Sequence, residues 1–430
     1  MQPIITVREH AKLSAGRQAS QQSLDEATLV QADFDWLCDL NASFRANGAQ
    51  LLHMDNRKWL RLDNYVGIVE MPSGMQIEIL PKHHAENAKA EDSRRLLCRM
   101  IQTALDLPTR DLGEADLSLF DAPLTEWVIQ QFLLALDSLI KRGLRFDYLR
   151  IEEEQRFLRG QLDMAQQMRQ PLGRQHMFRL RHDVLLPDRP ENRLLKSALQ
   201  LAATHTQDAG NWRIAHELLG ILAELPESRW VDADFRQWRH DRLMAHYEPV
   251  HPWCELILRQ QMPMAVSGNW HGISLLFPME KLFERYVEAG LRNALLPPTQ
   301  LYAQASHQWL CQHEGENFFQ LRPDFLVVGK TETWVLDAKW KRLNHNDRPN
   351  QYGLIKSDFY QLYAYGQKYL QGQGTVFLVY PKTEHFMEPL QPFHFSKNLF
   401  LCVLPFDLDH QNAIVPNGTI LPFKENLLIT

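Results

Sequence analysis

The chain has 430 residues, of which 45% are apolar and 23% charged, and these proportions predict a globular protein of two or three domains. No stretch approaches the roughly 20 uninterrupted apolar residues of a bilayer span, and the N-terminus lacks the features of a secretory signal, so we expect a cytoplasmic protein without membrane contact. The formal net charge of −6 excludes a protein whose whole surface binds nucleic acid, because phosphate neutralisation requires clustered Lys and Arg.

Residues 1–90 are predicted to form a β-rich N-terminal extension. Polar and apolar residues alternate from Gln76 to Ile79, next to a turn signal at Pro72-Ser73-Gly74. This pattern indicates a hairpin. We expect the hairpin to belong to a small barrel or sheet.

Residues 91–265 are predicted to be mostly helical. Apolar residues from Leu96 to Leu105 recur at helical spacing, and a second such segment, "LTEWVIQQFLLALDSLIKRGL", ends at Gly143. Helical patterning returns in "ENRLLKSALQLAATH" and in "WRIAHELLGILAEL". A break in regular structure is predicted near Pro263 and Gly268, and it separates this region from a last domain, residues 266–430.

A basic segment at about residues 150–181 interrupts the helical region. The turn signal Pro171-Leu172-Gly173 predicts that its flanks pair as a long hairpin or arm. Asp163 is its one acid between the first and last of six arginines, which are Arg156, Arg159, Arg169, Arg174, Arg179 and Arg181. Such a run is typical either of an arm that binds phosphates or an acidic partner surface, or of a solvated basic face.

Two neighbouring strand-like segments in the last domain carry acids and a base. "FFQLRPDFLVV" and "ETWVLDAKW" are rich in β-branched and aromatic residues, and Gly329-Lys330-Thr331 between them predicts a hairpin turn. Side chains alternate along a strand, so we expect Asp337 and Lys339 on one face. Asp324 lies near the start of the first strand, where pairing would place it beside Asp337.

These three side chains suit phosphodiester hydrolysis. Asp324 and Asp337 form a candidate site for Mg²⁺, or for Mn²⁺ in its place, because Mg²⁺ prefers a few carboxylate oxygens and keeps several waters. Such a metal lowers the pKa of a bound water, and Lys339 can hold that water or stabilise charge that develops on the phosphate. The alternative interpretation is an ordinary surface salt bridge.

An amphipathic helix is predicted upstream of this hairpin, in "PMEKLFERYVEAGL". It places Glu280, Glu284 and Glu288 four residues apart on one face. We select Glu284 as a candidate third acid. The alternative is that all three glutamates are solvated.

A second helix is predicted downstream, in "SDFYQLYAYGQKYL", with Ser357 as its N-cap. It places Gln361 and Tyr365 one turn apart, so Gln361 is a candidate supporting residue and Tyr365 either supports it or packs in the core. The five cysteines and 18 histidines show no zinc-ligand spacing, and no phosphate-binding loop for a nucleotide is present.

The pair Pro323-Asp324 and Asp337-Ala338-Lys339 resembles the motif of PD-(D/E)XK nucleases, and the Gln-x-x-x-Tyr helix resembles their RecB-like branch. The whole chain is similar to the McrC family, the nuclease subunits of McrBC-type modification-dependent restriction systems. Family-like segments over about residues 125–385 are "KRGLRFDY", "LRGQLDMAQQMR", "ENRLLKSAL", "LFERYV", "RPDF", "VLDAKWK" and "YQLYAY". The resemblance implies an α+β multidomain fold whose C-terminal α/β PD-(D/E)XK domain has a mixed central sheet flanked by helices.

The resemblance also implies a partner, a McrB-like AAA+ GTPase ring that binds the GTP. The McrC-like chain would stimulate NTP hydrolysis in that ring and cut double-stranded, methylcytosine-containing DNA in defence against foreign DNA. The segment that matches residues 150–181 would insert into the ring, which makes its six arginines candidate partner-binding residues.

Two other interpretations are open. The chain could be an NTPase-activating adaptor whose nuclease domain is inactive, although Asp324, Asp337 and Lys339 are retained. It could also be a stand-alone RecB-like repair nuclease, which would cut DNA ends without a partner.

Overall fold

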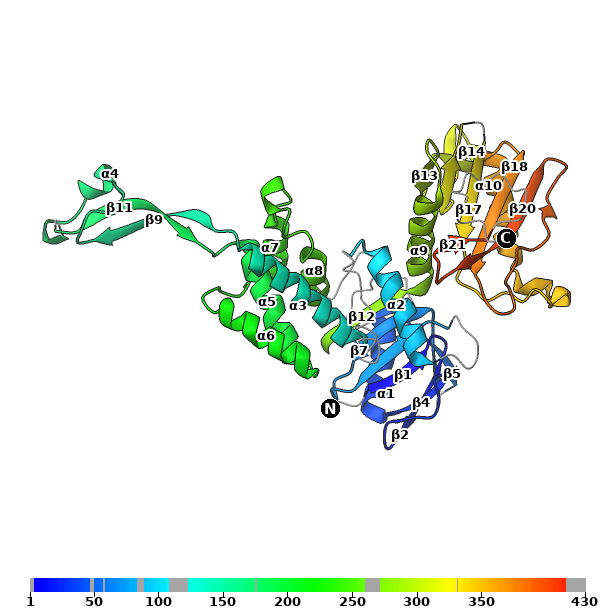
Figure 1. Ribbon diagram of the computed structural model, residues 1–430, viewed down its shortest axis with the longest axis horizontal. Coiled ribbons are helices and arrows are strands. Elements are labelled where there is room, and N and C mark those ends of the chain that lie inside the picture. The colour runs from blue at the N-terminus through cyan, green and yellow to red at the C-terminus, as the bar shows by residue number, and fades with distance from the viewer. Residues whose placement is uncertain are drawn as a thin grey trace. The chain divides into compact units, whose positions relative to one another are not determined.

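Both ends of the sequence belong to the same structural unit. Met1–Leu124 and Pro263–Thr430 form one unit, and Thr125–Met262 form the other. The computed structural model in Figure 1 describes residues 4–46, 50–56, 59–82, 89–107, 123–174, 176–259, 271–330 and 332–414. It is a mixed α+β structure with several sheets, which confirms the predicted fold class at that level. Within these ranges no helix is long and apolar enough to cross a membrane.

The N-terminal part of the first unit contains two sheets. Its strands are β1 (Ile4–Arg8), β2 (Lys12–Gly16), β3 (Ser20–Gln21), β4 (Glu26–Val30), β5 (Leu52–Asn56), β6 (Trp59–Leu62), β7 (Tyr65–Glu70) and β8 (Gln76–Leu80), joined by β12 (His271–Pro278). One sheet has the order β3-β4-β2-β6-β5, and the other has the order β1-β8-β7-β12. The antiparallel pairing of β7 with β8 confirms the predicted hairpin.

Helix α1 (Gln31–Ala46) lies between β4 and β5 and was not among the predicted elements. Its buried Phe34, Leu37 and Phe44 belong to the same apolar cluster as Leu13 and Leu60 of the sheet. Their spacing follows the helical period, so this stretch buries an apolar stripe although its surroundings are β-rich.

A buried ion pair attaches helix α2 (Ala90–Ala104) to the N-terminal sheet. Arg94 donates to both carboxylate oxygens of the fully buried Glu78, at 2.7 and 2.6 Å. Glu78 also accepts hydrogen bonds from the Thr6 hydroxyl and from the backbone N–H of Leu124. Because the charge is paired and its oxygens are hydrogen-bonded, burial is tolerated, and removal of either partner would leave an uncompensated buried charge.

Strand β12 leads the chain from the N-terminal sheet into the C-terminal region. It pairs antiparallel with β7, with Leu275 opposite Ile68 and Phe277 opposite Val66. Helix α9 (Met279–Ala294) follows at once, and its first N–H group, that of Met279, donates to the carbonyl of Asn64. The sheet therefore fixes the start of the helix that carries Glu284.

The second unit consists of helices and a hairpin arm. Its helices are α3 (Leu124–Arg142, of which all but Leu124 lies in this unit), α5 (Pro190–His205), α6 (Ala209–Ile221), α7 (Val231–Gln237), η3 (Arg242–Met244) and α8 (His251–Arg259). The arm contains β9 (Asp147–Gln155), β10 (Gln161–Leu162), α4 (Met164–Gln167), η2 (Leu172–Arg174) and β11 (Phe178–Leu186). Helix α3 ends at Arg142, directly before the predicted Gly143, whose φ of +95° suits glycine.

The arm is a long antiparallel hairpin, as predicted. Pairing of β9 with β11 runs from Gln155 opposite Phe178 to Asp147 opposite Leu186. Figure 1 shows these strands extending from the helices of the same unit, with α4 near the far end. The side-chain amide of Asn192 on α5 donates to the carbonyls of Arg145 and Pro187, which fixes both strands at the base of the arm.

The C-terminal region contains a mixed sheet of order β13-β16-β17-β18-β20-β19, with β21 on β20. Its strands are β13 (Gln300–Ala303), β16 (Phe325–Val328), β17 (Thr333–Ala338), β18 (Gly374–Pro381), β19 (Phe393–His394), β20 (Leu399–Asp407) and β21 (Asn412–Ala413). A separate hairpin is formed by β14 (Gln308–His313) and β15 (Glu316–Leu321). Strands β17, β18 and β20 run parallel and are mostly apolar, as expected of strands buried on both faces, with Asp337 near the end of β17 and Asp407 at the end of β20.

Two helices cover the two faces of this sheet. Helix α10 (Lys356–Tyr369) packs Leu362 into one cluster with Val335 and Leu401. Side chains alternate along β20, so Phe406 points to the opposite face from Leu401, and there its ring contacts Phe283 of α9. The predicted N-cap of α10, Ser357, is wrong: the N-cap is Ile355, two residues earlier, and its side chain makes no capping hydrogen bond.

Gly290 allows the close approach of α9 to β20. A β-carbon at this position would lie 2.5 Å from the carbonyl oxygen of Gln411 and 2.8 Å from the ring of Phe406. We expect Gly290→Ala to lower the free energy of unfolding by about 1–3 kcal/mol, because a well-packed interface must shift to admit the methyl group. Urea denaturation measures this change.

A matched control is Gly220→Ala on α6, where a β-carbon would meet nothing within 4 Å. Alanine should there stabilise the protein by about 0.5–1 kcal/mol through its helix propensity. Equal effects of the two substitutions would contradict the packing described for α9.

Candidate active site

The two predicted aspartates meet at one end of the β16–β17 hairpin. Phe325 lies opposite Leu336, and Asp324 directly precedes β16. The backbone N–H of Ala338 donates to Oδ2 of Asp324 at 2.8 Å, so that carboxylate reaches across to the residue after Asp337. The structure therefore brings Asp324 and Asp337 together at the carboxyl end of β17, where the alternating pattern had placed them.

Burial dominates the electrostatics of these two acids. It raises the pKa of Asp324 to about 8, with further contributions from the charges of Asp337 and Glu284. Asp337 is only 1% exposed, and burial likewise raises its pKa, although the charge of Lys339 opposes this. Two carboxyl groups that resist ionisation in the metal-free protein are a site where a cation would be strongly favoured.

Lys339 supplies positive charge next to Asp337. Its Nζ lies 2.5 Å from Oδ2 of Asp337, and its side chain is 30% exposed. Burial acts to lower the pKa of Lys339, but the charge of Asp337 outweighs it and the pKa is raised, so this lysine stays protonated. Lys339 therefore partly compensates the charge of the buried Asp337 carboxylate.

Of the three glutamates on α9, only Glu284 is joined to the aspartates. The Gln304 side-chain N–H₂ group donates to Glu284 Oε1 at 2.5 Å and to Asp324 Oδ1 at 3.2 Å. Burial raises the pKa of Glu284, and the hydrogen bond from Gln304 opposes that rise. Glu288 is instead paired with Arg285 and Arg292, and Glu280 is exposed. Sequence reasoning selected Glu284 but missed Gln304, which has no motif.

Gln361 reaches this region indirectly, through Tyr365. The Gln361 amide donates to the Tyr365 hydroxyl at 2.8 Å, and that hydroxyl donates to the backbone carbonyl of Arg322 at 2.9 Å. Burial, followed by the charge of Asp337, raises the pKa of Tyr365 to about 12, so the hydroxyl remains a donor. Because Arg322 lies two residues before Asp324, this chain of hydrogen bonds holds the segment that positions Asp324.

A contact from the N-terminal sheet also supports the site and was not predicted. The indole N–H of Trp340 donates to Oε1 of the buried Glu9 at 2.8 Å. The Trp340 ring also lies 5.2 Å from that of Phe283, the neighbour of Glu284. Trp340, the residue after Lys339, therefore contacts both Phe283 of α9 and Glu9, which directly follows β1.

The six arginines of the arm fall into two groups. Arg174 and Arg179 lie near Glu154, and Arg181 pairs with Glu152 and Asp163. The other three, Arg156, Arg159 and Arg169, are exposed and form no ion pair with any described residue. Exposed apolar side chains accompany this second group, namely Phe157, Leu158, Met164 and Met168.

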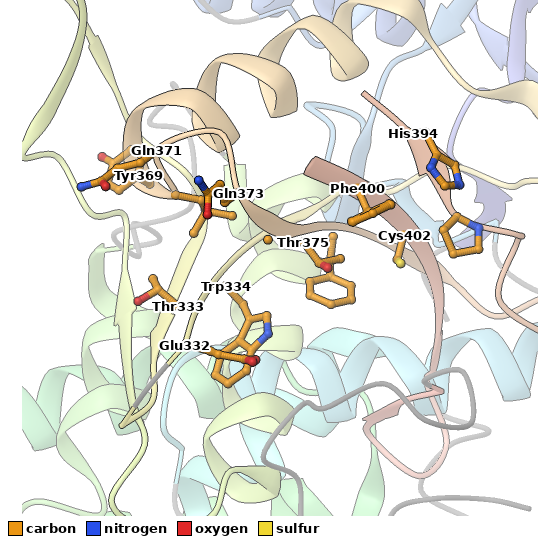
Figure 2. A pocket seen from close by; sticks show the side chains of 14 residues that line it. Glu332, Thr333, Trp334, Tyr369, Gln371, Gln373, Thr375, His394, Phe400 and Cys402 are labelled. Atoms are coloured by element: carbon orange, nitrogen blue, oxygen red, sulfur yellow. The ribbon is translucent and has the colours of Figure 1, made fainter. Parts of the chain in front are cut away.

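A cavity of about 790 Å³ lies at the amino ends of β17, β18 and β20, away from the aspartates. Figure 2 shows Trp334, Phe400 and Cys402 among the side chains that line it. None of its lining residues is one of the acids or Lys339. The candidate active site is therefore at the carboxyl end of β17 and is distinct from this cavity.

The carboxylate oxygens at this site suit a hard divalent cation that takes few ligands from the protein. In the described ranges no three His, Cys, Asp or Glu side chains are grouped so as to hold a metal ion. Mg²⁺, however, is usually bound by one or two carboxylates and keeps several waters. Asp324 and Asp337, two neighbouring buried carboxyl groups whose ionisation burial opposes, meet this requirement.

A family model described as McrBC 5-methylcytosine restriction system component matches residues 60–381. Among curated proteins there is no significant match. A chain of the refined half-complex from the tetradecameric assembly of Thermococcus gammatolerans McrB AAA+ hexamers with bound McrC has 21% identity and a TM-score of 0.71, covering 97% of this chain and 96% of that chain. A chain of the cryo-EM structure of the Thermococcus gammatolerans McrBC complex has 22% identity and a TM-score of 0.52, covering 67% and 87%. These likenesses show a shared fold.

The raised pKa of Asp324 predicts how the metal-free protein responds to pH. Between the ordinary value of 3.8 and about 8, the folded carboxyl keeps a proton that the unfolded one has lost. Raising the pH through this window therefore lowers stability. Asn cannot ionise, so we expect the Asp324→Asn variant to lose less stability than the wild type as the pH rises. The difference in stability between the two proteins should be largest above pH 8.

Thermal unfolding in the presence of a chelator, from pH 4 to pH 9, measures this difference. Glu316→Gln on the exposed strand β15 is the control and should follow the wild type. If the unfolding temperatures of Asp324→Asn and the wild type change with pH in the same way, Asp324 is not held in its neutral form.

Proposed function

Because the chain belongs to the family of McrBC 5-methylcytosine restriction system components, we propose that it is the McrC-like endonuclease subunit of such a system. In this proposal the C-terminal sheet is a PD-(D/E)XK nuclease domain that cleaves methylcytosine-containing double-stranded DNA. The observation that carries the proposal is the convergence of Asp324, Asp337 and Lys339 at one end of the β16–β17 hairpin.

Asp324 and Asp337 are the proposed ligands of Mg²⁺, or of Mn²⁺ in its place. When bound, the ion would supply an activated water and neutralise charge on the scissile phosphate. Asp324 is held for this role by the N–H of Ala338. Its high pKa in the metal-free protein means that cation binding and ionisation of the pair would favour one another.

Lys339 would act on the phosphate or on the attacking water. Its ammonium group is held by Asp337, yet nearly a third of the side chain remains accessible, so it can reach a bound substrate. A protonated lysine stabilises negative charge that develops on phosphate oxygens. Glu284 adds a third acid near Asp324, and Gln361 supports the site by holding Tyr365.

The arm is the proposed contact with a McrB-like AAA+ GTPase ring, which would bind the GTP itself. Two observations support this assignment. The arm carries the exposed Arg156, Arg159 and Arg169, which pair with no acid among the described residues, together with exposed Phe157 and Leu158, a combination suited to a partner surface that is apolar with acidic groups around it. The structural neighbours come from assemblies of McrB hexamers with bound McrC. Contact through the arm would stimulate NTP hydrolysis in the ring.

The nuclease assignment predicts that Asp337→Asn lowers cleavage of methylated DNA by at least about 100-fold, because the metal loses a charged ligand. The assay contains the full chain, the McrB-like partner, GTP and Mg²⁺, and it follows both DNA cleavage and GTP hydrolysis. Stimulation of GTP hydrolysis should survive the substitution. Glu332→Gln, at the exposed opposite end of the strand pair, is the control and should cleave normally.

Three results would contradict the proposal in different ways. Cleavage by Asp337→Asn at the wild-type rate would show that the proposed metal ligand Asp337 is not needed for catalysis. A wild-type protein that stimulates GTP hydrolysis but never cuts DNA would be an adaptor with an inactive nuclease domain. Cutting of DNA ends without any partner would indicate a stand-alone RecB-like repair nuclease.

The partner assignment predicts different effects for the two groups of arginines. Replacing Arg156, Arg159 and Arg169 together by Ala should weaken binding to the ring about tenfold or more and reduce its dependence on salt, because acids in the described part of the chain leave these three charges unpaired. Association is measured by analytical ultracentrifugation or light scattering. Arg213→Ala on α6, also exposed, is the control. Equal binding by the triple variant and the control would exclude these arginines from the interface.

A further inference from the structure

Gln304 occupies a constrained position next to the acids. It directly follows β13, and its φ of +51° lies in the left-handed region, which residues with a side chain seldom adopt. Its backbone N–H donates to the carbonyl of Asp324 at 2.9 Å. The backbone of Gln304 is therefore tied to the same segment that carries Asp324.

The side chain of Gln304 lies between two carboxylates from different elements. One amide N–H₂ group donates both to Glu284 of α9 and to Asp324 before β16. An amide nitrogen has two hydrogens to donate, so both are used on these acids. Burial raises the pKa of both acids, the charge of Glu284 adds to the rise for Asp324, and the hydrogen bond from Gln304 opposes the rise for Glu284.

The side-chain amide has a second end with the opposite polarity. Its Oε1 oxygen is an acceptor, and a primary amide exchanges the positions of its oxygen and nitrogen by rotation about its terminal torsion, which has a broad and roughly two-fold profile. Gln304 is exposed, so this rotation meets little obstruction. A cation near Glu284 and Asp324 would repel the N–H₂ end and attract the oxygen.

We propose that Gln304 is part of the cation site. Its N–H₂ group holds Glu284 and Asp324 in place when no metal is present, and its Oε1 oxygen turns toward the divalent ion, or toward a water on that ion, when one binds. This inference rests on the proposed metal-dependent function and deepens it. It also explains how a site without three grouped acidic or imidazole ligands in the described ranges supplies a further oxygen from the protein.

The test is a titration of the full chain with Mn²⁺, in which free Mn²⁺ is followed by electron paramagnetic resonance in the absence of DNA. Gln304→Met keeps the length of the side chain but removes the amide, and we expect about tenfold weaker Mn²⁺ binding, the smaller end of the range for groups that orient metal ligands. Gln300→Met is the matched control, because Gln300 is an exposed glutamine at the start of β13, the strand that precedes Gln304, and it has no hydrogen bond to the acids. It should bind Mn²⁺ as the wild type does.

A second variant keeps the inference testable if Gln304→Met does not fold. Gln304→Glu places a fourth carboxylate beside Asp324, Asp337 and Glu284, and we expect it to bind Mn²⁺ more tightly than the wild type. In the presence of a chelator at pH 8, the same variant should unfold at a lower temperature than the wild type, because like charges then repel without compensation. Tighter Mn²⁺ binding by Gln304→Glu would show that position 304 lies within reach of the bound ion.

The outcomes separate this inference from the proposed function. If the wild type binds Mn²⁺ and Asp337→Asn abolishes cleavage, but Gln304→Met binds Mn²⁺ as well as or better than the wild type, Gln304 lies outside the cation site. If Gln304→Glu fails to tighten binding, the same conclusion follows. If the wild type itself binds no Mn²⁺ and Asp337→Asn still cleaves, the metal-dependent function is wrong and the role of Gln304 falls with it.

Discussion

Desolvation of the carboxyl groups of Asp324 and Asp337 is the constraint on which the candidate site depends. Both lie where a hairpin of apolar strands enters the interior, and burial raises the pKa of each. Isolated ionised carboxylates are too costly in such a place, so the surroundings supply compensation. The N–H of Ala338 and the ammonium of Lys339 provide part of it, and a divalent cation would provide the rest.

The groups that support these acids come from several distant parts of the sequence. Tyr365 on α10 holds the carbonyl of Arg322, and Trp340 is held by Glu9 at the end of the N-terminal strand β1. Each contact fixes a residue next to a proposed ligand or to Lys339. The position of the reactive groups is therefore set by helices and strands on both faces of the sheet, which is how a precise site is kept rigid.

The sequence predicts what is local in this arrangement. Alternation and a short turn are enough to place Asp324 beside Asp337, because hairpin register follows from both. Glu284 was selected from the sequence, and the structure supplies the reason why Glu288 is unsuitable, since Arg285 and Arg292 pair with Glu288. The contact between Glu9 and Trp340 spans 331 residues and leaves no pattern. Helix α1 and the true start of α10 were missed because packing outweighed local propensity and the apparent Ser357 cap.

The pairing of β12 with β7 has a consequence for the order of synthesis. Glu70 and His271 are partners although about 200 residues separate them, and most of the intervening chain folds as the helical unit and its arm. On the ribosome, β7 therefore emerges long before the strand that covers its free edge. An unpaired strand edge is a template for pairing with other chains. Rapid folding of the intervening helices, whose contacts are local, would shorten the time for which the nascent chain is exposed to aggregation.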